Sequence, residues 1–175
     1  MARASYGKTS KDSTFKTNVA GAQNHGIAVG AYHYSYAASV SDAQKEAKNL
    51  LAAVKGLKLT YPLVFDLENN SYTTKAQSQW TAIALAFLSA VQDAGYYAML
   101  YSNENALANI YDMKKLAAFD VWVAQWGPSV TYTGEYGIWQ FSDTGKISGI
   151  SGDVDTDTAY KNYAEIIQSK KLNQL

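Results

Sequence analysis

The chain has no cysteine and only two histidines among its 175 residues, and these shortages exclude several kinds of site. Without cysteine there can be no disulfide framework, thiolate zinc site, iron–sulfur cluster or cysteine nucleophile. A divalent-metal hydrolase stays open as an alternative, with His33, Asp66, Glu68 and Asp155 as its ligands. Two histidines argue against it, because metal sites generally need several well-spaced histidine or carboxylate ligands. We therefore expect neither a cofactor nor a metal.

The chain also lacks an excess of charge of either sign, since 15 lysine and arginine residues balance 15 aspartate and glutamate residues. It therefore has no basic footprint of the kind that nucleic-acid backbones require, and we expect no nucleic-acid partner. No run approaches the ~20 apolar residues of a membrane-spanning helix, and the first residues contain no apolar signal core of ~7–15 residues. We expect no membrane partner and no signal peptide in the given chain.

What the chain does have is the composition of a folded protein. Hydrophobic residues make up 47% and charged residues 17%, which is typical of a globular domain rather than a disordered segment. Fourteen tyrosines and four tryptophans supply a core, and some of them could form a flat surface for a ring-shaped ligand. We expect one domain over residues 1–168, followed by a frayed polar tail over residues 169–175.

The hydrophobic periodicity alternates between two and about 3.6, which is typical of strands alternating with helices. Strands are expected at residues 2–6, 27–36, 61–67, 96–101, 121–126 and 137–141. Helices are expected between them, and a last helix is expected from residue 156 or 157. Such an α/β order predicts a parallel sheet. Because no G-x-G-x-x-G motif follows the first strand, a closed barrel is favoured over an open doubly wound sheet.

Two carboxylates, Asp66 and Glu68, lie two residues apart at the end of the most apolar predicted strand. A period of two puts both on one face, with their Cβ atoms roughly 6–7 Å apart. Carboxylates this close repel, so one is driven neutral while the other stays charged, as glycoside hydrolysis requires. The spacing does not decide between retention and inversion. The alternative is that Asp66 caps the following loop and Glu68 is only solvated.

Several segments, in order over almost the whole chain, resemble one known family. They are residues 30–34 (Gly-Ala-Tyr-His-Tyr), 62–68 with Asp-Leu-Glu, 123–126 (Val-Ala-Gln-Trp), 138–141 (Ile-Trp-Gln-Phe) and 148–155. The family is that of the glycoside hydrolase family 25 lysozymes, N-acetylmuramidases of bacteria and phage endolysins. The resemblance implies an irregular TIM-like β/α barrel that cleaves the β-1,4 bond between N-acetylmuramic acid and N-acetylglucosamine. Its partner is then the glycan strands of peptidoglycan, and it acts on the cell wall, secreted or released by a phage.

The resemblance also implies roles for three acidic residues. Glu68 corresponds to the general acid, and we expect it to have the higher pKa of the carboxylate pair. Asp66 corresponds to the carboxylate that stabilises the acetamido group of the substrate as internal nucleophile, with net retention. Asp155 corresponds to a further acidic residue in the catalytic groove.

Other polar and aromatic residues end the predicted strands, and in a barrel such ends converge on one mouth. The expected substrate-binding residues are His33, Tyr34, Tyr101, Asn103, Gln125, Trp126, Trp139 and Gln140. His33 could equally be a satisfied structural residue. Trp126 and Trp139 could stack against sugars, whereas Trp122 and Trp80 are assigned to the core.

The sequence departs from the family at its start. Residues 2–6 resemble the second strand of the family, so we expect the given sequence to lack the first strand, with its Asp-Val-Ser-like motif, and the first helix. We therefore expect an open or incomplete barrel whose new edge, Ala2 to Tyr6, could pair with a second copy. The alternative function is a catalytically impaired, carbohydrate-binding remnant of the same fold.

Overall fold

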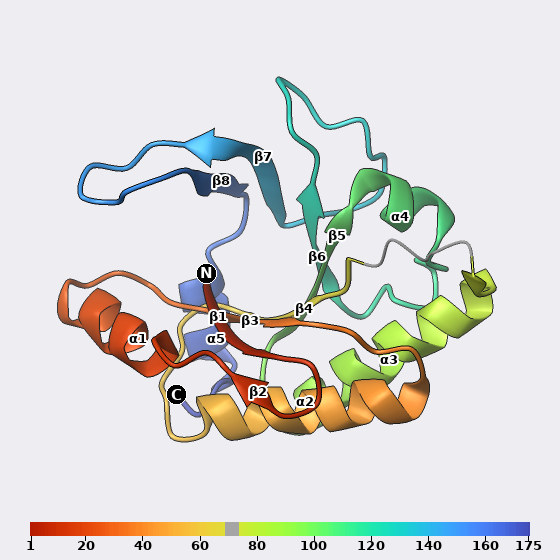
Figure 1. The fold of residues 1–175 in the computed structure, drawn as a ribbon, viewed down its shortest axis with the longest axis horizontal. Helices are drawn as coiled ribbons and strands as arrows, with labels where there is room; N and C mark the ends of the chain where they lie inside the picture. Colours follow the sequence, from red (N-terminus) through yellow and green to blue (C-terminus); the bar gives the residue numbers. More distant parts are fainter. Residues whose placement is uncertain (69–73) are drawn as a thin grey trace.

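The computed structural model describes residues 1–68 and 74–175 (Figure 1). Within them, one sheet has the strand order β2-β1-β3-β4-β5-β6-β7-β8. Its strands are β1 (Ala2–Tyr6), β2 (Ser10–Lys11), β3 (Ala31–Tyr34), β4 (Leu63–Asp66), β5 (Ala98–Asn103), β6 (Asp120–Ala124), β7 (Ile138–Gly145) and β8 (Val154–Ala159). Neighbouring strands from β1 to β7 are parallel, and β2 and β8 are antiparallel additions at the two edges.

The helices lie on both faces of this sheet. They are α1 (Phe15–Asn24), α2 (Val40–Val54), α3 (Gln77–Asp93), α4 (Glu104–Asn109) and α5 (Tyr163–Ser169). Strand alternation separates two cores, as β4 illustrates. Phe65 packs outward on Phe87 of α3, with ring centroids 4.2 Å apart, whereas Val64 packs on the inner face with Tyr163 of α5. No helix of the described residues is long and apolar enough to cross a membrane.

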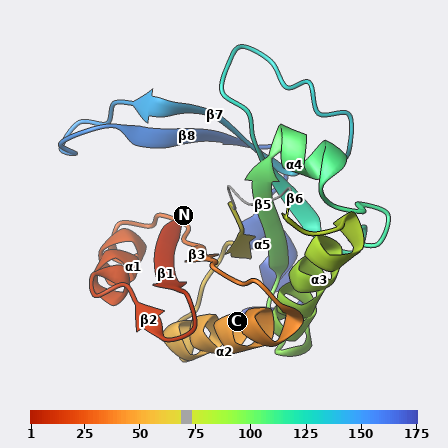
Figure 2. The ribbon, with the colours of Figure 1, turned by 45° about the vertical axis from the view of Figure 1, so that its right-hand side comes forward.

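The sheet is curled but not closed, as expected of an incomplete barrel. Figure 1 and Figure 2 show the β7–β8 hairpin running above β1 and α1 without joining them. Among the described residues, β8 pairs only with β7, and no ladder joins β8 to β1 or β2. The architecture is therefore an α/β, TIM-like half-barrel.

The expected edge strand, Ala2 to Tyr6, is partly covered by the chain itself. The turn after Tyr6 uses Gly7 at φ +54°, which glycine adopts at little cost, and returns the chain as β2. β2 pairs antiparallel with Ser5 and Tyr6, and the backbone N–H of Asp12 donates to the carbonyl of Ala4 at 3.0 Å. Within β1, only the residues before Ala4 then have no partner on this side among the described residues.

The expected last helix is wrong in its first part, since residues 154–159 form β8 instead. Thr158 pairs with Trp139 and Asp157 with Gln140, so the segment completes a hairpin with β7. The helix begins only after Asn162, whose side chain accepts from the backbone N–H of Glu165. Valine and threonine at alternate positions favour a strand when a partner strand is present.

The C-terminal tail is anchored rather than frayed. Asn173 is fully buried, and its amide nitrogen donates to the carbonyls of Leu59 and Tyr61, both at 2.9 Å. Its side-chain oxygen accepts from the backbone N–H of Tyr97 at 2.9 Å. Asn173 has φ +55°, a region that asparagine tolerates better than most residues. The tail therefore ties together the segments that enter β4 and β5.

Candidate active site

A hollow of about 250 Å³ lies at the inner face of the sheet near the carboxyl ends of its strands. It is lined by Arg3, Tyr32, Tyr34, Asp66, Glu68, Tyr101, Trp122, Gln140 and Asp155. Every strand except β2 contributes at least one of these side chains. The carboxyl end of a parallel β/α sheet is where such folds carry their sites, and we refer to this candidate active site as the catalytic pocket below.

The register of the sheet aligns four of these residues in one row. Tyr34 pairs with Asp66, Asp66 with Tyr101, and Tyr101 with Trp122. Because side chains alternate along each strand, the four point to the same face. The rings of Tyr101 and Trp122 meet edge to face, with centroids 4.7 Å apart. The row forms the floor of the catalytic pocket.

Asp66 is the buried acid of the pocket. It is 7% exposed, and its Oδ1 has no hydrogen-bond partner among the described residues. Burial first, and then the charges of Glu68 and Asp155, raise the pKa of Asp66 to about 8. We expected a raised pKa at Glu68, but the raised pKa is that of Asp66, and burial is its larger cause, with the repulsion expected from the sequence second. Glu68 is exposed whereas Asp66 is buried, and this difference in burial distinguishes the two carboxyl groups.

Tyr101 and Gln140 join the pocket to an exposed tryptophan. The Tyr101 hydroxyl donates to Oε1 of Gln140 at 3.0 Å, and Nε1 of Trp126 donates to the same oxygen at 3.1 Å. Burial and the nearby carboxylates of Glu68 and Asp66 raise the pKa of Tyr101, which keeps its hydroxyl a hydrogen-bond donor. Trp126 is 60% exposed, so its ring is available at the rim of the pocket.

Two of the expected substrate-binding residues have structural roles elsewhere. His33 is fully buried on the opposite face of β3 from Tyr34, and it contacts Ser5 and Glu46. Asn103 caps α4, since its side chain accepts from the backbone N–H of Ala106 at 2.9 Å. Neither residue lines the catalytic pocket.

Gln125 and Trp139 also lie outside the pocket. The side-chain amide of Gln125 binds the loop that follows it. The amide nitrogen donates to Oγ1 of Thr131, and the amide oxygen accepts from the backbone N–H of Thr131, both at 2.7 Å. Trp139 is on the opposite face of β7 from Gln140, packs against the main core and donates from Nε1 to the Gln125 carbonyl at 2.8 Å. The structure therefore brings Tyr34, Tyr101 and Gln140 to the three predicted acids.

Three pocket residues were not expected. Arg3 forms an ion pair with Asp12 at 3.0 Å, and Tyr32 precedes Tyr34 by two positions on β3. Trp122, assigned to the core, lines the pocket and donates from Nε1 to Asp157 at 2.8 Å. The period of two that places Tyr34 would have placed Tyr32, since both lie on one face of the same strand.

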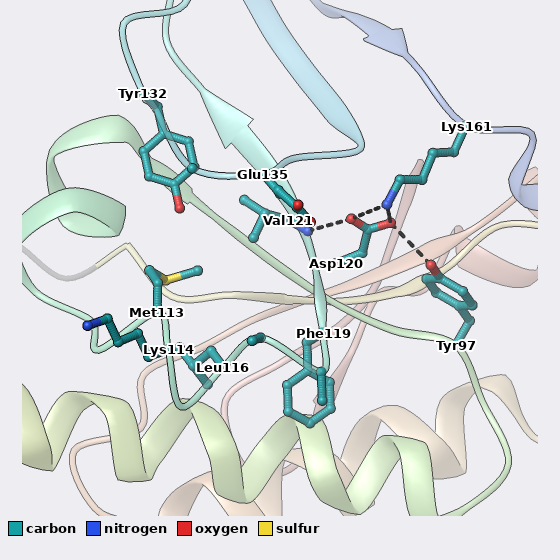
Figure 3. Close-up of a pocket in the computed structure, with 13 residues that line it drawn as sticks. Tyr97, Met113, Lys114, Leu116, Phe119, Asp120, Val121, Tyr132, Glu135 and Lys161 are labelled. Atoms are coloured by element: carbon teal, nitrogen blue, oxygen red, sulfur yellow. Dashed lines mark hydrogen bonds and ion pairs between the residues drawn. The ribbon is translucent and has the colours of Figure 1, made fainter.

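A second hollow, of about 440 Å³, has a hydrogen-bonded charge cluster in its wall (Figure 3). It surrounds Asp120, at the start of β6 and so away from the carboxyl ends of the strands. Asp120 accepts from the hydroxyls of Tyr97 and Tyr163, and from Nζ of Lys161 at 3.0 Å to each oxygen. These donors use the hydrogen-bond accepting positions of both carboxylate oxygens, so we assign Asp120 a structural role.

No three histidine, aspartate or glutamate side chains are grouped to hold a metal ion in residues 1–68 and 74–175.

Comparison with known proteins agrees with this geometry. The chain is 30% identical over 162 residues to the autolytic lysozyme of Clostridium acetobutylicum, an alignment that covers 89% of this chain and 46% of the relative. The solved CTP1L endolysin matches with a TM-score of 0.80 and 27% identity, over 95% of this chain and 59% of that one.

The modular autolysin LytC from Streptococcus pneumoniae, solved with a synthetic peptidoglycan ligand, matches with a TM-score of 0.77 and 26% identity. That match covers 89% of this chain and 39% of LytC. This chain thus spans less than two thirds of the length of each of these three proteins. The family model described as glycosyl hydrolases family 25 matches residues 1–150, which is most of the sequence. The chain belongs to glycosyl hydrolases family 25.

Proposed function

We propose that the chain hydrolyses the β-1,4 bond between N-acetylmuramic acid and N-acetylglucosamine in peptidoglycan, with retention of configuration. The observation that carries this proposal is a buried Asp66 beside Glu68 and Asp155 in a pocket at the carboxyl ends of the strands. A relative named as an autolytic lysozyme and a structural neighbour solved with a peptidoglycan ligand support the substrate class. The site of action is then the cell wall.

In the proposed mechanism Glu68 is the general acid. It is the exposed member of the pair, so it can reach the glycosidic oxygen of a bound glycan and protonate it as the bond breaks. The acetamido oxygen of the substrate attacks the anomeric carbon, and the positive charge develops on that acetamido group. Glu68, now ionised, then takes a proton from the water that opens the intermediate.

Asp66 has the complementary role at the floor of the pocket. The raised pKa of Asp66 keeps it protonated at neutral pH. A positive charge developing on the acetamido group favours the ionised Asp66, and the proton that Asp66 loses passes to Glu68, which delivers it to the glycosidic oxygen. Asp66 can then stabilise the charge when it appears, and Asp155 adds a second negative charge to the same pocket.

Release of reducing ends from purified peptidoglycan tests the proposal against its alternative. An active muramidase releases reducing ends, whereas a catalytically impaired, wall-binding remnant binds muramic-acid oligosaccharides without releasing them. Binding without release over long incubation would favour the remnant. Activity that disappears with EDTA would instead favour the divalent-metal alternative.

Trp126 and Trp139 should respond differently to substitution. Trp126→Ala removes the exposed ring at the pocket rim and is expected to weaken binding of a muramic-acid oligosaccharide by about 1 kcal/mol, close to fivefold, with little change in Tm. Trp139→Ala removes a ring packed on the core and should lower Tm while affinity is retained. Calorimetric titration and thermal melting separate the two effects. The reverse pattern would place the sugar-binding surface on the other face of β7.

We also propose that the uncovered start of β1, Ala2 and Arg3, pairs with a second copy of the chain. β2 covers Ser5 and Tyr6, and Asp12 covers the carbonyl of Ala4, so only these first residues offer an unpaired strand edge, which favours such pairing. Light scattering after size exclusion should show a mass that rises from monomer to dimer with concentration. A monomer at every concentration would contradict the pairing.

A further inference from the structure

Glu46 of α2 is a fully buried carboxylate that contacts the carboxyl end of β3. Its Oε2 accepts from Oγ of Ser35 at 2.5 Å and faces Nε2 of His33 at 3.2 Å. Its Oε1 accepts from the backbone N–H of Tyr36 at 3.1 Å. Burying a carboxyl group costs free energy unless polar groups contact it. Here His33, Ser35 and Tyr36 provide three such contacts. Glu46 therefore holds the chain where it leaves β3.

The residues that Glu46 holds are adjacent to the catalytic pocket. Tyr34 lies between His33 and Ser35, and strand alternation turns Tyr34 into the pocket while its neighbours face α2. The backbone N–H of Ser35 donates to the carbonyl of Asp66 at 2.8 Å. The position of Ser35 is thus coupled directly to the backbone of Asp66.

His33 extends the same network toward β1. Its Nδ1 lies 2.8 Å from Oγ of Ser5, so a hydroxyl, an imidazole and a carboxylate are connected in series. Ser5, His33 and Glu46 are all 0% exposed, and no substrate can reach the hydroxyl. The series is therefore not a nucleophilic triad, and its contacts act on the position of the strands.

We propose that Glu46 is a positioning residue for the hydrolysis, fixing Tyr34 and Asp66 relative to one another through the end of β3. This inference rests on the proposed function. A displacement of about 1 Å at a reacting group can cost about 10²-fold in rate. Loss of the Glu46 contacts therefore lowers kcat more than it raises KM.

The test compares Glu46→Gln with Asn49→Ala, a control on the same helix. Asn49 donates to the carbonyls of Gly7 and Ser10 at 3.0 and 2.9 Å, so it joins α2 to the β1–β2 turn without contacting Ser35. Both variants should lower Tm. Glu46→Gln should lower kcat per folded molecule by about 10- to 100-fold with KM changed little, whereas Asn49→Ala should keep kcat within about twofold.

A milder variant and a second readout keep the test decisive. Ser35→Ala removes one hydroxyl and leaves the backbone bond to Asp66, so it should fold and show a smaller fall in kcat. If Glu46→Gln or Ser35→Ala folds and keeps the kcat of the unsubstituted chain, the proposal is wrong.

The carboxyl carbon resonance of Asp66 gives a measurement that needs no activity. It should move in Glu46→Gln and Ser35→Ala but stay in place in Asn49→Ala. An Asp66 resonance unchanged in all three variants overturns the positioning role. If the unsubstituted chain releases no reducing ends, the proposed function fails, while this resonance still decides whether Glu46 positions Asp66.

Discussion

Replacing Glu68 by glutamine is expected to lower reducing-end release from peptidoglycan by about 10²–10⁴-fold. The amide keeps the shape of the side chain and can still form hydrogen bonds, but its N–H groups are too weakly acidic to protonate the leaving oxygen. Because Glu68 is exposed, its replacement should leave Tm almost unchanged. The measurement is the initial rate at saturating substrate, with folding verified by circular dichroism.

Glu135→Gln is the matched control for this substitution. Glu135 is an exposed glutamate that lines the hollow around Asp120, away from the catalytic pocket. It should retain the activity of the unsubstituted chain. Activity of Glu68→Gln within a factor of a few of that control would remove Glu68 from the role of general acid.

Asp66→Asn is expected to stabilise the fold at high pH while it removes activity. The pKa of Asp66 is raised to about 8 in the folded chain, from an ordinary value of 3.8. The folded state therefore binds this proton more tightly than the unfolded state. The resulting stabilisation is complete below pH 3.8 and is lost as the pH rises through about 8.

At pH 9 the unsubstituted chain must hold an ionised carboxylate whose Oδ1 has no partner among the described residues, and asparagine avoids that charge. We expect Asp66→Asn to be more stable by about 2–4 kcal/mol at pH 9, after allowing for the cost of burying an amide, and to lose this advantage near pH 4. Activity should fall by at least about 10²-fold, because a neutral amide cannot stabilise developing positive charge.

Thermal melts at pH 4, 7 and 9 measure this effect, with Asp93→Asn at the exposed end of α3 as the surface control. A stability difference for Asp66→Asn that is the same at all three pH values would show that folding does not raise the pKa of Asp66.

The alternation of strands and helices was predictable because each buried strand and each amphipathic helix has its own period. The same periodicity put Asp66 and Glu68 on one face of their strand, and the resemblance added Asp155. It did not decide which face of β3 points inward, so His33 was grouped with Tyr34 although they lie on opposite faces. Contacts with neighbouring strands and helices decide which face of a strand points inward. Those contacts cannot be read from the sequence of the strand alone.

Other differences have the same cause, since they depend on contacts between distant segments. Asp157 reads locally as a helix cap, but pairing with Gln140 makes it part of a strand. Asn173 reads as part of a polar tail, yet it is buried by carbonyls more than 100 residues earlier in the chain. The higher pKa of Asp66 likewise follows from burial, which spacing alone does not reveal.

The row of Tyr34, Asp66, Tyr101 and Trp122 has a consequence for how the site forms during folding. Each member comes from a different strand, and roughly 20 to 35 residues separate successive members. Contacts at such separations require loops to close first, which slows folding. The indole of Trp122 also donates to Asp157 on β8, the last strand in the chain. Its fluorescence should therefore report the arrival of the final strand, and recovery of activity during refolding should not precede that signal.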